Sequence, residues 1–175
     1  MTRRDLLRSG LIAGLMAVLP GCEQSPQTSA SEAAMPFEPL KMTAEEWKAV
    51  LTPEQFAVLR EHGTERAFTS PLEREHRDGT FVCAGCNLPL FSSAGKFDSG
   101  TGWPSFFEPI AAANVATSWD FKLVYPRTEY HCARCGGHQG HVFKDGPPPT
   151  GQRWCNNGVA LQFVPAGDPL PPLRT

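Results

Sequence analysis

The fold is decided by two short stretches of sequence, Cys83-Ala84-Gly85-Cys86 and Cys132-Ala133-Arg134-Cys135. Each has the Cys-x-x-Cys spacing of a metal-binding loop, and Zn²⁺ prefers a tetrahedral shell of soft ligands that two such pairs complete. The segment between the pairs is longer than in a compact zinc ribbon, but the entropic cost of closing a loop rises only slowly with its length. These four cysteines therefore predict one structural zinc ion that joins distant parts of the chain.

The segments around the cysteine pairs have the pattern of short β-strands. Residues 79–83 are rich in β-forming residues, and residues 121–125 and 159–164 show the alternation typical of strands. The connections are dense in Gly and Pro, and no long helical pattern separates the strands, which argues against a parallel α/β sheet. We expect a mainly β, antiparallel fold.

A helical hairpin is expected at the N-terminal end of this β domain. Thr43 and Thr52 each begin the sequence pattern of a capping box, and Pro53 suits the first position of a helix. Gly63 predicts the end of the second helix. An apolar stripe along both helices indicates that the hairpin packs on the main body.

The overall composition excludes one broad class of function. The chain has 175 residues and a formal net charge of −2, with 17 Pro and 16 Gly that follow no period. A nucleic-acid-binding protein normally has a surplus or a stripe of basic residues, so no nucleic acid is expected as a partner. The length predicts one folded domain with many turns and short elements.

The first residues have the pattern of an export signal. Arg3 and Arg4 precede a short apolar run at residues 11–19, which cannot cross a bilayer as a helix. The arginine pair resembles a twin-arginine signal, and Leu19-Pro20-Gly21-Cys22 resembles a lipoprotein cleavage box whose cysteine receives lipid. An uncleaved anchor, or a reading frame that starts too early, is the alternative. Export would place the protein in the cell envelope or periplasm, with lipid on Cys22 as its membrane anchor.

The chain therefore divides into four expected segments. These are an export signal at residues 1–22, a flexible tether rich in Gln, Ser, Thr and Ala at 23–40, a folded domain at 41–166 and a Pro-rich C-terminal tail at 167–175.

Two other uses of the cysteine pairs stay open on the residues alone. An exported protein meets oxidising conditions, in which the four thiols could form two disulfides. Each pair could instead be a thioredoxin-type redox pair, which needs a strand followed by a helix. The residues after the pairs, Asn87-Leu88-Pro89 and Gly136-Gly137, oppose a helix. Folding before export would allow zinc to be loaded in the reducing cytosol, which favours the metal site.

Cys155 is left without a partner if the other four cysteines hold a metal. In an extended segment Arg153, Cys155 and Asn157 share one face, because side chains alternate along a strand. A guanidinium beside a thiol favours the thiolate, which is the reactive form of cysteine. The alternative is an inert buried thiol. In an unbroken strand, Val159 and Leu161 would lie on the same face as Cys155, and that apolar face would be buried.

Three further side chains are candidates for chemistry or binding. His138 and His141 stand close together in sequence and are free for proton transfer if the cysteines fill the shell of the metal. Additional metal ligands or surface residues are the alternative. Trp103 lies in a glycine-flanked loop that would leave its indole accessible, or it is an ordinary core tryptophan. His62 and His76 belong to no motif.

Three motifs together resemble the peptide-methionine (R)-S-oxide reductases, the MsrB family. They are Lys96-Phe97-Asp98-Ser99-Gly100-Thr101-Gly102-Trp103-Pro104-Ser105-Phe106, His138-Gln139-Gly140-His141-Val142-Phe143 and Arg153-Trp154-Cys155-Asn156-Asn157. The N-terminal segments Glu46-Trp47, Leu51-Thr52-Pro53-Glu54-Gln55 and Glu65-Arg66-Ala67-Phe68-Thr69 agree with them. The resemblance covers residues 41–165 and implies two antiparallel sheets around the site, with zinc held by both cysteine pairs. It makes residues 41–166 a catalytic domain.

The resemblance implies a role in catalysis for four residues. Cys155 is the nucleophile that attacks the sulfoxide sulfur and becomes a sulfenic acid. His141, with His138, donates protons to the sulfoxide oxygen, and Asn157 orients this network.

Three further residues are implied to bind the substrate or tune the nucleophile. Trp103 packs against the S-methyl group of the substrate, and Phe143 adds an apolar wall. Arg153 holds Cys155 as the thiolate. Such a pocket accepts a chiral sulfur in only one of its two configurations, which explains selectivity for one epimer.

One position departs from the family pattern and bears on recycling. Many members carry a recycling cysteine where this chain has Thr101. No other free thiol remains in the mature chain if the four cysteines hold zinc, so we expect a thioredoxin-like protein or a small thiol to reduce the oxidised enzyme. The expected substrates are oxidised proteins bearing methionine-R-sulfoxide, and a monomer is expected. Rival hypotheses are a zinc-stabilised β module that binds without turnover, and a general thiol-disulfide oxidoreductase.

Overall fold

The computed structural model describes residues 36–122 and 125–175. The expected export signal at residues 1–22, including Cys22, lies outside the described residues, as does the expected tether up to residue 35. The described residues belong to one compact unit. Among them, no helix combines the length and the apolar character that crossing a membrane requires.

Two helices, α1 (Ala44–Val50) and α2 (Pro53–Glu61), form the expected hairpin. Both begin with a complete capping box, at Thr43 and at Thr52. The residue that ends α2 is His62 rather than Gly63, and it takes the left-handed conformation (φ 54°, ψ 37°) that glycine usually supplies. The buried side chains that attach the hairpin to the main body are Trp47, Leu51, Val58 and Leu59.

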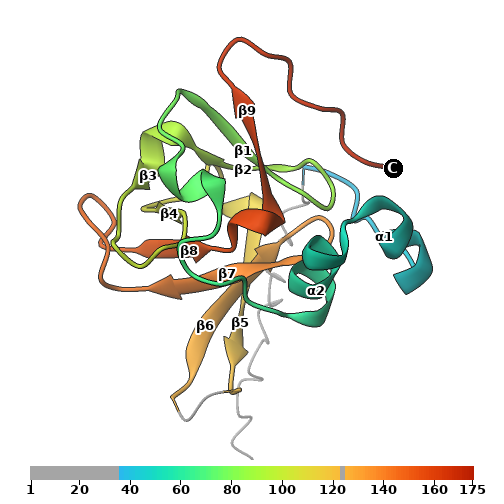
Figure 1. The fold of residues 1–175 in the computed structure, drawn as a ribbon, viewed down its shortest axis with the longest axis horizontal. Coiled ribbons are helices and arrows are strands. Elements are labelled where there is room, and N and C mark those ends of the chain that lie inside the picture. Colours follow the sequence, from blue (N-terminus) through green and yellow to red (C-terminus); the bar gives the residue numbers. More distant parts are fainter. Residues whose placement is uncertain (1–35, 123–124) are drawn as a thin grey trace, which may run out of the picture. The chain divides into compact units, whose positions relative to one another are not determined.

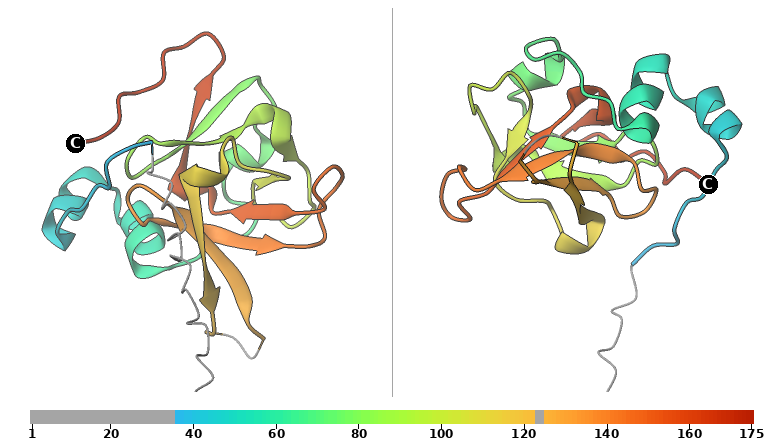
Figure 2. Two further views of the ribbon diagram at one scale, coloured as in Figure 1. Left: turned by 180° about the vertical axis from the view of Figure 1, so that it is seen from behind. Right: turned by 90° about the horizontal axis from the view of Figure 1, so that it is seen from below.

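The strands of the described residues form two antiparallel sheets, which confirms the expected fold class (Figure 1). The three-stranded sheet has the order β2-β1-β9, and the six-stranded sheet has the order β3-β4-β8-β7-β6-β5. The strands are β1 (Gly79–Cys83), β2 (Pro89–Ser92), β3 (Lys96–Phe97), β4 (Ser105–Phe106), β5 (Val115–Asp120), β6 (Arg127–Cys132), β7 (His138–Phe143), β8 (Arg153–Asn156) and β9 (Leu161–Pro165). Short 3-10 helices are η1 (Pro71–Arg74), η2 (Ser93–Gly95), η3 (Ala112–Asn114) and η4 (Gly158–Ala160). Figure 2 shows both sheets from two further directions, with α1 and α2 together at one end.

One expected strand is wrong and another is shorter than expected. β5 ends at Asp120 and β6 begins at Arg127, so the described residues of the segment expected at 121–125, namely Phe121, Lys122 and Tyr125, belong to no strand. The Asp120 side chain accepts a hydrogen bond from the backbone N–H of Lys122 at 2.9 Å, a local turn contact that competes with strand pairing. The aromatic rings of Phe121 and Tyr125 are therefore exposed and form no core face. The segment expected as a strand at 159–164 enters η4 first, and β9 begins at Leu161.

An aromatic core between the two sheets holds β8 in place. Phe91 on β2 stacks on Phe106 on β4 at a centroid distance of 4.3 Å, and Tyr130 on β6 meets Trp154 on β8 edge-on at 4.9 Å. Burial of each such ring stabilises the fold by roughly 1.5–3 kcal/mol. Because Trp154 points into this core, the next residue on β8, Cys155, points to the opposite face of the sheet.

Both ends of the described chain pack near the cysteine pairs. Phe37 and Leu40, at the end of the expected tether, contact the core, and the Leu40 N–H donates to the Arg134 carbonyl oxygen at 2.8 Å. In the C-terminal tail, the Arg174 guanidinium donates to the Gly85 carbonyl oxygen at 2.6 Å. The tail therefore braces the loop that carries the first cysteine pair.

Candidate functional site

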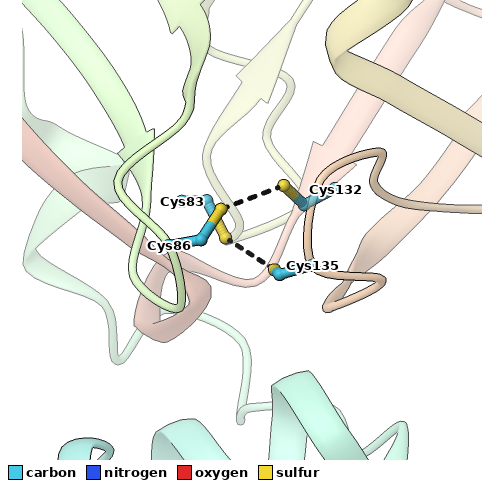
Figure 3. A group of neighbouring side chains, drawn as sticks. All are labelled: Cys83, Cys86, Cys132 and Cys135. Carbon is cyan, nitrogen blue, oxygen red and sulfur yellow. Dashed lines mark hydrogen bonds between the residues drawn. The ribbon is translucent and has the colours of Figure 1, made fainter. Parts of the chain in front are cut away.

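The four cysteines of the two pairs form one buried cluster (Figure 3). The sulfur atoms of Cys83 and Cys135 lie 3.7 Å apart, and those of Cys86 and Cys132 lie 3.5 Å apart. Sulfurs on one tetrahedral zinc ion are separated by about 3.8 Å, whereas a disulfide bond measures about 2.05 Å. The cluster is therefore compatible with a structural zinc site, and the described cysteines form no disulfides.

The backbone around both pairs adopts the same metal-binding turn. The N–H of Asn87 donates to the Cys83 carbonyl oxygen at 2.8 Å, and the N–H of Gly136 donates to the Cys132 carbonyl oxygen at 2.8 Å. Asn87 and Gly136 occupy equivalent positions after each pair, and both have positive φ angles, of 63° and 67°. Neither pair opens a helix, which removes the structural context of a thioredoxin-type redox pair.

Strand register places Cys155 beside a histidine. Cys155 on β8 pairs with His141 on β7 on one side and with Ser105 on β4 on the other. A Cβ at Gly140 would collide with the Cys155 carbonyl oxygen, so the glycine of the His-Gln-Gly-His motif permits this close approach. A cavity of about 100 Å³ opens over Cys155. Its lining includes four of the sequence-predicted residues beside Cys155, namely Trp103, His141, Phe143 and Asn157.

Each motif histidine is held by a carboxylate that the sequence did not reveal. The Nε2 of His141 lies 2.7 Å from Asp120 Oδ2, and the same oxygen accepts a hydrogen bond from Arg127 at 2.6 Å. The Nδ1 of His138 lies 2.7 Å from Glu129 Oε1. Asp120 and Glu129 come from β5 and β6, and no local motif links them to the histidines, because only strand pairing brings them together.

The two histidines are neutral at neutral pH. They lie one behind the other with respect to the cavity. Burial lowers the pKa of both, and the hydrogen bonds that the imidazoles donate to Asp120 and Glu129 offset that effect only in part. His141 lines the cavity, whereas His138 is buried behind it with a ring-centroid distance of 5.6 Å. His141 is thus the imidazole placed to exchange a proton with a ligand in the cavity, and His138 supports it.

The expectation that Arg153 favours the Cys155 thiolate stays a prediction, and burial of the sulfur opposes the effect of Arg153. Burial raises the pKa of the Cys155 thiol, and Arg153, Thr101 and Ser105 lower it by a smaller amount. Arg153 donates two hydrogen bonds of 2.9 Å to Asp145, and its guanidinium stacks on the Phe143 ring at 4.2 Å. Arg153 is therefore shared between Asp145 and Cys155, and the pKa of the Cys155 thiol stays above its ordinary value because burial has the larger effect.

Glu65 organises the cavity wall and was not singled out from the sequence. Its carboxylate accepts hydrogen bonds from the N–H groups of Gly158 and Val159 at 2.6 and 2.9 Å. Its backbone N–H donates to Asn157 Oδ1 at 3.0 Å, and its carbonyl oxygen accepts from Trp103 Nε1 at 3.2 Å. One residue therefore positions two sequence-predicted residues, and its place in the Glu-Arg-Ala-Phe-Thr motif was the only signal that could have identified it.

Thr101 lies beside the nucleophile, where a recycling cysteine would stand. Its Oγ1 is 4.0 Å from Cys155 Sγ, and it also forms a hydrogen bond of 2.8 Å with Ser99. A hydroxyl at this distance can donate to the sulfur atom but cannot form a disulfide with it.

Comparison with known proteins agrees with this geometry. Residues 51–165 match the SelR domain family. A peptide methionine sulfoxide reductase MsrB from Thiobacillus denitrificans is 54% identical over 123 residues, which cover 70% of this chain and 93% of that protein. The MsrB proteins of Agrobacterium fabrum (53% identity, 69% and 89% coverage) and Methanosarcina mazei (50% identity, 74% and 92% coverage) are similarly related. The chain therefore belongs to the MsrB family, the peptide-methionine (R)-S-oxide reductases.

Proposed function

We propose that this chain reduces methionine-R-sulfoxide in oxidised proteins, with Cys155 as the nucleophile. The observation that carries this proposal is the cavity in which Cys155, His141 and Trp103 converge from three separate segments. A thiol that is reachable and flanked by an imidazole is suited to attack an electrophilic sulfur atom.

The Cys155 thiol and the sulfoxide together supply every atom and electron that the reaction needs. The Cys155 sulfur attacks the sulfoxide sulfur, and its proton, relayed through His141, goes to the sulfoxide oxygen. The S–O bond of the substrate breaks, methionine leaves as the thioether, and the OH group ends on the Cys155 sulfur as a sulfenic acid. Two electrons pass from Cys155 to the substrate, so the enzyme is oxidised by one step.

The resting protonation states support this order of events. The Cys155 thiol is neutral and therefore carries the proton that the sulfoxide oxygen needs. His141 is neutral and hydrogen-bonded to Asp120, which stabilises the imidazolium that forms during the relay. The neighbouring Arg153 guanidinium stabilises negative charge that develops on the sulfur during attack.

The side chains around the sulfur select the substrate. Trp103 and Phe143 provide apolar walls for the S-methyl group, and Asn157 is held by hydrogen bonds to Glu65 and Gln139. Since the polar and apolar walls are fixed relative to Cys155, only one arrangement of oxygen, methyl and lone pair about the chiral sulfur suits attack.

An external thiol completes the cycle. Among the described residues, the cysteines other than Cys155 are buried in the four-cysteine cluster, and Thr101 occupies the position next to the nucleophile. A first thiol of a thioredoxin-like protein or a small-molecule reductant displaces water from the sulfenic acid to give a mixed disulfide. A second thiol then releases Cys155.

Zinc, the export signal and the monomeric state complete the proposal. Cys83, Cys86, Cys132 and Cys135 would hold one Zn²⁺, which supplies cross-linking of the two loops. The twin-arginine pattern at Arg3 and Arg4 supports export to the cell envelope or periplasm, and Cys22 is the proposed site of lipid attachment. We take the protein to act as a monomer.

The test is a reduction assay on a peptide that contains either the R or the S epimer of methionine sulfoxide, with zinc measured on the same sample. Wild-type protein should turn over the R epimer with either a thioredoxin or dithiothreitol, and Cys155→Ser should abolish turnover. After one equivalent of substrate, mass spectrometry should show a gain of about 16 Da on Cys155 and no internal disulfide. Turnover by Cys155→Ser, or a disulfide that includes Cys155, would contradict the proposal.

A further inference from the structure

A second cluster of potential metal ligands lies outside the catalytic cavity. Glu129 Oε1 is 2.7 Å from His138 Nδ1 and 3.0 Å from His62 Nδ1, so two imidazoles converge on one carboxylate oxygen. The two imidazole rings are 5.3 Å apart. The donor atoms of His62, Glu129 and His138 all lie within 4.8 Å of one another.

This donor set and its spacing suit zinc. Two imidazole nitrogens and a carboxylate oxygen form a ligand set that proteins use for Zn²⁺ with an open fourth position. Donor atoms on one tetrahedral zinc ion are about 3.3 Å apart, so the nitrogen–oxygen distances to His138 and His62 need to open by about 0.6 and 0.3 Å. The other Glu129 oxygen accepts a hydrogen bond from Ser118 at 3.0 Å, which orients the carboxylate from behind.

The backbone places His62 for this role. A helix that ends in the left-handed conformation usually has glycine there, yet α2 has His62 at φ 54°, with its imidazole directed onto Glu129. The His62 side chain is 48% exposed, whereas Glu129 and His138 are buried, so the cluster has one ligand open to solvent and two buried ligands. A shallow cavity of about 380 Å³ borders His62 and Glu129 and gives an ion access from solvent.

One positive charge lies near this entrance without blocking the donors. The Lys122 ammonium group donates to the backbone oxygen of His62 at 3.4 Å, not to the Glu129 carboxylate or to either imidazole. The carboxylate of Asp120 also lines the cavity, although its Oδ2 is shared between His141 and Arg127.

We propose that His62, Glu129 and His138 form a second, lower-affinity Zn²⁺ site, separate from the four-cysteine cluster, and that zinc bound there inhibits the enzyme. Binding takes the place of the two hydrogen bonds that Glu129 Oε1 receives from His62 and His138, and it fixes His138 next to a dication. The inhibition, unlike the binding, rests on the proposed function, because it requires His138 to support His141 in proton transfer.

The binding test uses full-length protein already loaded with zinc at the cysteine cluster, in a Cys155→Ser background so that the nucleophile cannot bind metal. Titration with Zn²⁺ should show a further equivalent, and Co²⁺ should give a visible spectrum without thiolate charge-transfer bands. His62→Asn removes the imidazole but keeps a residue that accepts the left-handed conformation, so α2 should end normally. It should weaken this binding by roughly 10-fold or more. His76→Asn, at an exposed histidine, is the matched control and should bind like the parent.

The inhibition test compares turnover with and without added Zn²⁺ in proteins that retain Cys155. Excess zinc should lower turnover of the parent and of His76→Asn, and His62→Asn should lose most of that sensitivity. No further equivalent, or undiminished binding by His62→Asn, would overturn the site, whether or not the protein reduces methionine sulfoxide. Binding that depends on His62 but leaves turnover unchanged would overturn the inhibition.

Discussion

At the scale of single residues, the chemistry depends on how burial and charge are balanced at Cys155. Burial raises the pKa of the thiol, while Arg153, Thr101 and Ser105 lower it, and burial has the larger effect. The Arg153 guanidinium is shared with Asp145, so it reaches the sulfur with reduced effect. The pKa of the Cys155 thiol therefore lies above its ordinary value, and we expect the sulfur to become reactive as its proton is transferred.

Removal of Arg153 should make Cys155 less reactive at a fixed pH. Without the guanidinium the thiolate loses its main electrostatic support, so the pKa of Cys155 should rise further in Arg153→Ala. The measurement is the rate of Cys155 alkylation by iodoacetamide against pH. For the wild type this rate should still be rising at pH 9.0, the ordinary pKa of the thiol, and the profile of Arg153→Ala should shift to higher pH. A wild-type rate that reaches its plateau below pH 7 would show that a thiolate is preformed.

At the scale of elements, β5, β6 and β7 carry an acid-sensitive network. Asp120 on β5 bridges His141 on β7 and Arg127 on β6, and the pKa of its carboxyl is well below the usual value. The causes are hydrogen bonds from Lys122, His141 and Arg127 and the charge of Arg127. The pKa of His141 is also lowered, chiefly by burial.

The fold should therefore lose stability as pH falls. A lowered histidine pKa means that the unfolded chain binds the proton more readily, so the His141 contribution declines as pH falls below 6.5. The Asp120 contribution is present above its unfolded pKa of 3.8 and declines below that pH. Thermal unfolding between pH 7.5 and pH 3 measures the trend. Below pH 3.8 the melting temperature of Asp120→Asn should fall less than that of the wild type. Both proteins keep the cysteine cluster, so an equal fall in the two melting temperatures would rule out the role of Asp120.

The segment after α2 is joined to η4 through Glu65. In Glu65→Gln one carboxylate oxygen becomes an NH₂ group, so the N–H of Gly158 or Val159 loses its acceptor. An unpaired buried donor costs about 1–3 kcal/mol, and the free energy of unfolding should fall by that amount in urea. The control Glu61→Gln changes an exposed carboxylate and should stay within about 0.5 kcal/mol of wild type. Equal stability of the two variants would contradict the role given to Glu65.

At the scale of the whole molecule, the four-cysteine cluster connects the two sheets and reaches toward the active site. Cys83 ends β1 of the three-stranded sheet, and Cys132 ends β6 of the six-stranded sheet. Gln139 on β7 lies between cluster and site, with its Nε2 3.4 Å from Cys83 Sγ and its carbonyl oxygen accepting from the Asn157 side chain at 2.9 Å. Loss of a metal from this cluster should therefore affect both stability and turnover.

Zinc removal should lower the stability of the whole folded domain. A structural zinc site contributes directly to folding, so a metal-free sample or Cys132→Ser should lose several kcal/mol, on the order of a 10 °C fall in melting temperature. Zinc release is followed with a chromogenic chelator, and unfolding is followed by circular dichroism. Cys155→Ala, which leaves the cluster intact, should melt like the wild type. An unchanged melting temperature after complete metal removal would contradict the structural role.

Patterns along the chain were sufficient to predict the local features, which are the capping boxes that begin both helices, the two Cys-x-x-Cys turns, and the motifs that carry Cys155, His141 and Trp103. These follow from spacing over a few residues, which a linear pattern records directly. Contacts between distant segments place Asp120 and Glu129 on the histidines, let Glu65 position the cavity wall, and bury the Cys155 sulfur so that its thiol pKa is raised. Strand register and burial produce these features, and both arise from segments far apart in the chain, so no local pattern of residues contains them.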